Sequence, residues 1–115
     1  MSAVNEPEEL AVDITTGPGK ADGEWLVTVS GEIDVASSPR LRNELIELLD
    51  QKAQSIVLDL GSTSFIDSSG LGVLVGALRR LREQNGQSIV LRGMQPPVRR
   101  VFEITGLTDL FTIEG

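Results

Sequence analysis

Two short segments near the start of the chain alternate between apolar and polar positions. Residues 10–15 and residues 25–30 each carry an apolar side chain at every second position, which predicts two half-buried β-strands. Between them, residues 17–23 (GPGKADG) have the composition of a turn, so we expect the two strands to form a hairpin. Residues 31–34 (GEID) interrupt the alternation, and the second strand is expected to end there.

Three later segments repeat apolar residues at helical spacing. The first follows Ser38 and Pro39, which suit the N-cap and the first position of a helix. The second follows an expected loop at residues 61–67 and ends at Asn85 and Gly86, and the third opens at Pro96. The positions that define the three apolar stripes are Leu41, Leu45, Leu48 and Leu49; Leu71, Leu74, Val75, Leu78 and Leu81; and Val98, Val101, Phe102 and Thr105.

Short apolar runs separate these helices. Residues 55–60 (SIVLDL) and 88–92 (SIVLR) are typical of buried strands, and residues 111–113 add a last short strand. The predicted order is therefore ββαβαβαβ. Strand-helix-strand units favour parallel pairing, and the hairpin adds an antiparallel strand, so we predict an α/β fold with a mixed, mostly parallel sheet. We place this single domain at residues 10–115, after a flexible N-terminal tail at residues 1–9.

The composition excludes several classes of function. The chain has no Cys and no His, which removes thiolate nucleophiles, a Ser-His-Asp triad and the usual zinc sites. A net charge of −7 argues against nucleic-acid binding, which requires a basic face. No apolar run approaches the roughly 20 residues of a membrane span, and the start of the chain lacks the features of a signal peptide. We therefore expect a cytoplasmic protein that holds no metal or other cofactor.

The most informative segment reads SFIDSSGLG from residue 64 and connects a predicted strand to a predicted helix. A helix N-terminus offers free backbone N–H groups and the positive end of the helix dipole to an anion. Asp67, Ser68 and Ser69 all suit a helix cap, so any one of them can be purely structural. One cap needs only one such residue, however, and Gly70 and Gly72 are expected to leave the helix start unshielded for a large partner.

Three enzyme motifs come close to this segment, and each lacks a residue that its chemistry requires. A nucleophile elbow has the form G-x-S-x-G, which this segment does not match. It also depends on a histidine, which the chain lacks. A phosphate-binding loop needs a lysine, which residues 61–72 do not contain. A dinucleotide-binding loop needs a third glycine where Val75 stands. The segment is therefore better explained by a modified serine than by catalysis.

The stretch FIDSSGLG from residue 65 resembles the phosphorylation-site motif of bacterial anti-sigma factor antagonists, which belong to the STAS family. Three further segments agree with this resemblance: GEID at residues 31–34, IVLDL at residues 56–60 and VRRVFEITGL at residues 98–107. The resemblance as a whole covers nearly the entire chain, from about residue 10 to residue 113. The resemblance implies a STAS-type fold.

The resemblance also implies a regulatory switch in place of an enzyme. In this family the first serine after the aspartate, here Ser68, is phosphorylated by an anti-sigma factor that is also a serine kinase. The unphosphorylated protein binds that anti-sigma factor and frees the sigma factor, and a serine phosphatase resets the switch. The family pattern places Asp34 beside the serine, and the expected partner-binding surface also includes Asp67, Ser69 and Gly70. We expect the free protein to be a monomer.

Two other functions stay open at this point. One is a STAS scaffold or transport-complex subunit whose serine is never modified, although the intact DSSG motif disfavours it. The other is a hydrolase that uses the carboxylates of Asp34 and Asp67. Such a hydrolase would need a ligand pocket beside these two residues.

Overall fold

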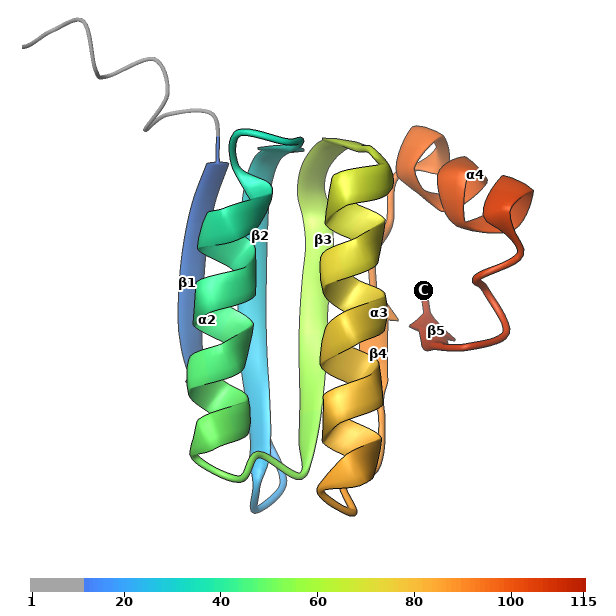
Figure 1. Ribbon diagram of the computed structural model, residues 1–115. Coiled ribbons are helices and arrows are strands. Elements are labelled where there is room, and N and C mark those ends of the chain that lie inside the picture. The colour runs from blue at the N-terminus through green and yellow to red at the C-terminus, as the bar shows by residue number, and fades with distance from the viewer. Residues whose placement is uncertain (1–11) are drawn as a thin grey trace, which may run out of the picture.

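A computed structural model describes residues 12–115, which form one β-sheet with helices packed on it. Helices α2 and α3 lie side by side across one face of the sheet (Figure 1). The predicted α/β class and the order ββαβαβαβ are confirmed. Within the described residues, no helix is long and apolar enough to cross a membrane. The elements are β1 Val12–Pro18, β2 Glu24–Ile33, α2 Ser38–Asp50, β3 Ser55–Ile66, α3 Ser68–Glu83, β4 Ile89–Arg92, α4 Pro96–Thr105 and β5 Thr112–Glu114.

Strands β1 and β2 form the predicted hairpin at one edge of the sheet. They pair antiparallel, with Val12 opposite Gly31 at the open end. Gly23 in the connecting turn has a φ of 78°, a conformation that glycine adopts without strain. The predicted first strand began at Leu10, which lies outside the described residues, as does the predicted tail at residues 1–9.

The other strands are parallel to β2 and follow in the order β2-β3-β4-β5. The mixed, mostly parallel sheet is thus confirmed. Because β2 and β3 run in the same direction, their carboxyl ends meet at one edge of the sheet. Helices α2 and α3 both begin at this edge, at the top of Figure 1.

The helical stripes predicted from the sequence pack against the sheet and form the core, except that Thr105, predicted on the third stripe, is exposed. All four leucines of the α2 stripe are buried, and most of the α3 stripe is buried with them. They pack in one cluster with strand residues such as Val27, Leu58 and Leu91, each 0% exposed. Near the C-terminus, Phe102 of α4 meets Phe111 edge-on, with ring centroids 5.9 Å apart. Burial of each large apolar side chain contributes about 1.5–3 kcal/mol, so this cluster holds the helices on the sheet.

The first helix starts one residue earlier than predicted. Ser38 is its first residue, and Ser37 occupies the N-cap position, so the assignment of Ser38 as the cap was wrong. The Ser37 hydroxyl makes no capping bond to the helix. It donates instead to the carbonyl oxygen of Glu32 at 2.7 Å. The serine pair therefore belongs to the turn that precedes the helix as much as to the helix itself.

Two segments predicted to be irregular are mostly strand. The expected loop at residues 61–67 was wrong because β3 runs on to Ile66. The second strand was also expected to be interrupted at residues 31–34, and this was wrong for residues 31–33, because β2 continues to Ile33. These two extensions pair with each other, with shifts in register along the way. The hydroxyl of the fully buried Thr63 bonds a carbonyl oxygen of β2 at 2.8 Å, so this polar stretch is satisfied within the sheet.

Candidate functional site

The ends of β2 and β3 bring the two predicted site segments together. Ile33 pairs with Ile66 in the parallel ladder. The N–H of Asp67 donates to the carbonyl oxygen of Ile33 at 3.1 Å, which extends the pairing by one more residue. Asp34 and Asp67 therefore leave neighbouring strands at the same edge of the sheet. The structure thus places Asp34 next to the segment that begins α3.

Asp67 holds the first turn of α3 through one carboxylate oxygen. It is the N-cap residue, and its Oδ1 accepts from the N–H groups of Ser69 at 2.9 Å and Gly70 at 3.3 Å. The same oxygen accepts from the Ser69 hydroxyl at 2.5 Å. This hydroxyl bond, followed by the backbone N–H bonds, lowers the pKa of Asp67 below its usual 3.8, although burial opposes the shift. The carboxylate is therefore ionised near neutral pH and committed to the cap.

Ser68 is the first residue of α3, and its side chain is exposed. Within residues 12–115 its hydroxyl has no hydrogen-bond partner, whereas the hydroxyl of Ser69 is bonded to Asp67. The N-terminal end of α3, where the helix dipole is positive, lies at this residue. Of the two serines, Ser68 is the one that another protein can reach without breaking an existing bond.

The two glycines after the serines have different surroundings. Gly70 is buried, and a Cβ there would lie 2.6 Å from Cγ2 of Ile33 and 2.8 Å from Cγ1 of Ile66. Gly72 is exposed, and a Cβ there would meet no atom of residues 12–115 within 4 Å. The expectation that both glycines leave the helix start unshielded was therefore wrong for Gly70. This residue lets the first turn of α3 approach the strand ends closely.

Asp34 shapes the turn between β2 and α2. Its Oδ1 accepts from the N–H groups of Ala36 and Ser37, each at 3.0 Å. Ser37 completes this turn, because its hydroxyl donates to the carbonyl oxygen of Glu32 and accepts from the Asp34 N–H at 2.9 Å. The buried Ser37 was not predicted as a site residue, since its sequence context indicated only a helix start. The carboxylate of Asp34, like that of Asp67, is thus oriented by its own turn.

The surface around Ser68 is acidic and partly apolar. The segments that meet at this edge, residues 31–39 and residues 61–72, carry Glu32, Asp34 and Asp67 and contain no Lys and no Arg. The next cation along the chain, Arg40, donates to the carbonyl oxygen of Val12 at 2.9 Å. Val35 is 75% exposed and Phe65 is 46% exposed, although both are large hydrophobic residues. Exposed apolar side chains with a polar rim are typical of surfaces that contact other proteins. Neither residue was predicted as part of the partner surface, although Phe65 opens the FIDSSGLG motif and Val35 directly follows the GEID segment.

The sequence and fold of this chain match those of characterised bacterial proteins. A family model described as the STAS domain matches residues 19–115. An anti-sigma-B factor antagonist of Bacillus subtilis (strain 168) is 41% identical over 89 residues, which cover 77% of this chain and 80% of that protein. This degree of identity extends over most of both chains.

Solved structures of anti-sigma factor antagonists share the fold. One from Mycobacterium paratuberculosis is 32% identical, with a TM-score of 0.73, and covers 89% of this chain and 86% of that chain. SpoIIAA in its unphosphorylated form has a TM-score of 0.75 and covers 88% of this chain and 87% of that chain. At 24% identity it shows the likeness of the fold alone. On the family match and the sequence identity together, the chain belongs to the STAS domain family, among its anti-sigma factor antagonists.

Proposed function

We propose that this protein is an anti-sigma factor antagonist that switches through phosphorylation of Ser68. The unphosphorylated protein binds an anti-sigma factor and frees the sigma factor for transcription, and the phosphorylated protein releases the anti-sigma factor. The observation that carries this proposal is the exposed Ser68 hydroxyl, without a partner in residues 12–115, at the start of α3. The name of the Bacillus subtilis relative, an anti-sigma-B factor antagonist, supports the same role.

The proposal includes two partner enzymes. The anti-sigma factor is also the serine kinase that transfers a phosphoryl group from ATP to the Ser68 oxygen, and a serine phosphatase removes this group. The antagonist is the substrate of both enzymes and is not itself an enzyme, which fits a chain without His or Cys. We place it in the cytoplasm, where sigma factors act, as a monomer that needs no cofactor.

The hydrogen bonds at the start of α3 favour Ser68 over Ser69 as the phosphorylated residue. The Ser69 hydroxyl is bonded to Oδ1 of Asp67, and the residue is half-buried. A phosphoryl group on Ser69 would oppose the charge of that carboxylate and disrupt the cap. Ser68 can accept the group without losing a bond, at a helix N-terminus that stabilises negative charge.

The acidic surroundings explain why phosphorylation would release the partner. A phosphoryl group adds a charge of about −1.5 to −2 at pH 7. It would lie near Asp67, on an edge formed by stretches without Lys or Arg. In the free protein, water and the N-terminus of α3 compensate for this charge, so the fold need not change. In a packed complex the group must lose water beside carboxylates, and a cost of about 3 kcal/mol weakens binding roughly a hundredfold.

Phosphorylation by the cognate anti-sigma kinase tests the assignment of Ser68. The protein is incubated with the kinase and ATP, and the modified peptide is identified by mass spectrometry. We expect one phosphoryl group on Ser68 and none on the Ser68→Ala variant, which should still bind the anti-sigma factor with wild-type affinity. Ser64→Ala changes an exposed serine in the neighbouring strand and should be phosphorylated normally. Transfer to any other residue of the wild-type protein would show that the assignment is wrong.

The two alternative functions have less support. Asp34 and Asp67, the carboxylates of the hydrolase alternative, each use an oxygen to accept N–H groups of their own turns. This is the arrangement of capping groups. A scaffold or transport-complex subunit would have the same fold with an unmodified serine, and the kinase experiment separates it from the proposed switch.

A further inference from the structure

Ser68 is the first of a row of positions along α3. Residues four apart lie on the same face of a helix, about 6 Å from one another along its axis, so Gly72, Gly76 and Arg80 follow Ser68 in this row. Gly72 and Gly76 are both exposed. Together with residues of α2, which lies alongside α3 in Figure 1, they line a groove between the two helices.

This groove has a volume of about 280 Å³ and is mostly apolar. The α2 side carries Arg42 and Ile46, and the α3 side carries Gly72, Val73 and Gly76. Ile46 and Val73 are partly exposed, and core leucines of α2 lie beneath them. The groove therefore offers apolar surface with a cation at its rim.

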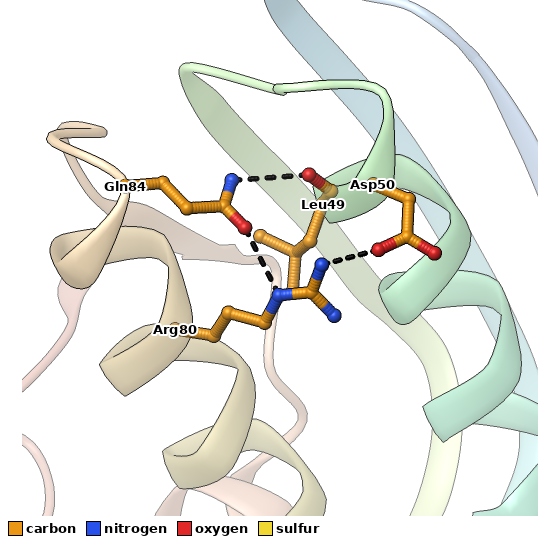
Figure 2. Close-up of polar contacts among 4 residues, drawn as sticks. All are labelled: Leu49, Asp50, Arg80 and Gln84. Carbon is orange, nitrogen blue, oxygen red and sulfur yellow. Dashed lines mark hydrogen bonds and ion pairs between the residues drawn. The ribbon is translucent and has the colours of Figure 1, made fainter.

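A set of polar contacts closes the groove at the end distant from Ser68. The Arg80 guanidinium is paired with the carboxylate of Asp50, and its Nε donates to Oε1 of Gln84 at 2.9 Å (Figure 2). The Gln84 amide donates in turn to the carbonyl oxygen of Leu49 at 3.0 Å. The two helices are tied together here, whereas the glycine nearest to Ser68 leaves the other end uncovered. The groove is thus open on the side of the switch residue.

Nothing within the described residues requires glycine at positions 72 and 76. A Cβ on Gly72 or Gly76 would meet no atom within 4 Å, and neither residue has a positive φ. Glycine is the poorest helix former apart from proline, so both positions weaken α3. Gly70, by contrast, is forced to be glycine by the strand side chains around it. An exposed glycine on a helix lets another molecule approach the backbone closely, and a docking surface is a use that fits both positions.

We infer that the groove between α2 and α3 is a second docking surface for the anti-sigma factor, continuous with the edge that carries Ser68. This inference rests on the proposed function and adds the chemistry of the partner segment. An apolar side chain of the partner enters between Ile46 and Val73, and a carboxylate of the partner pairs with Arg42. Arg42 is exposed and forms no ion pair within residues 12–115, so in this acidic protein it is a free cation beside an apolar groove.

Filling the groove tests the inference. Gly76→Leu places a side chain in the open space, and we expect it to weaken binding to the anti-sigma factor about tenfold or more in isothermal titration calorimetry. Its Tm should equal or exceed that of the wild type, because leucine is the better helix former. Arg42→Ala should weaken binding about threefold. Arg79→Ala removes the same charge from a part of α3 outside the groove and should bind normally. Wild-type affinity of Gly76→Leu would overturn the inference.

An NMR titration of the wild-type protein with the anti-sigma factor does not depend on any variant. We expect the amide signals of Arg42, Ile46 and Gly76 to shift or broaden together with that of Ser68. Changes confined to the edge around Ser68 would overturn the inference. Wild-type binding is the control in both experiments: its absence contradicts the proposed function, whereas wild-type binding that the groove variants leave intact contradicts the docking surface alone.

Discussion

At the scale of single residues, the two serines of the site differ in whether their hydroxyl groups already form hydrogen bonds. The sequence motif offers three capping residues in a row, and spacing alone does not divide their roles. The structure distinguishes these roles, because the Ser69 hydroxyl donates to Oδ1 of Asp67, whereas the Ser68 hydroxyl has no hydrogen-bond partner in residues 12–115. The family resemblance pointed to Ser68, and this arrangement of bonds supplies a physical reason for it.

The Asp67 cap should make stability depend on pH. Because the pKa of Asp67 is lowered in the folded protein, its ionised form stabilises the fold above about pH 4, and this contribution is lost as the pH falls through the lowered pKa. Asp67→Ala should reduce the free energy of unfolding by about 1 kcal/mol near pH 7. The difference in the free energy of unfolding between the wild type and Asp67→Ala should become smaller toward pH ~3.

Urea unfolding at both pH values measures this difference. Asp67→Asn keeps a side-chain oxygen that can cap the helix, so it should lose less stability than Asp67→Ala near pH 7. A difference between wild type and Asp67→Ala that does not change with pH would contradict the assigned role of the ionised carboxylate.

At the scale of elements, local patterns predicted the helices and the apolar strands. The stripes on α2 and α3 and the apolar run of residues 55–60 each carry their own periodicity. The extensions of β2 to Ile33 and of β3 to Ile66 have no such signal, because these mostly polar segments become strands by pairing with each other. The burial of Gly70 follows from this pairing, since Ile33 and Ile66 occupy the space beside it.

Gly70→Ala and Gly72→Ala form a matched pair that tests the close approach of α3 to the strands. Gly70→Ala pushes a methyl group against Ile33 and Ile66, and we expect it to lower the free energy of unfolding by about 1–3 kcal/mol. Gly72→Ala meets open space and should raise it by about 0.5–1 kcal/mol. Urea unfolding of both variants gives the two values, and an equal effect at the two positions would contradict the packing described for Gly70.

At the scale of the whole molecule, the sheet gathers the functional groups at one edge. The parallel strands β2 and β3 direct Asp34 and Asp67 to the same edge, and α2 and α3 extend from it with the groove between them (Figure 1). The sequence was sufficient for the fold class and the order of elements. The groove was not predictable, because Arg42 and Gly76 lie on helices that meet only in the tertiary structure.

The affinity for the anti-sigma factor before and after phosphorylation of Ser68 tests the proposed switch most directly. Isothermal titration calorimetry on both forms should show that phosphorylation weakens binding roughly a hundredfold. The circular dichroism spectra of the two forms should be the same, because the added charge need not change the fold. Ser68→Glu carries less charge and should weaken binding in the same direction by a smaller factor. Equal affinity of the phosphorylated and unphosphorylated forms would contradict the switch.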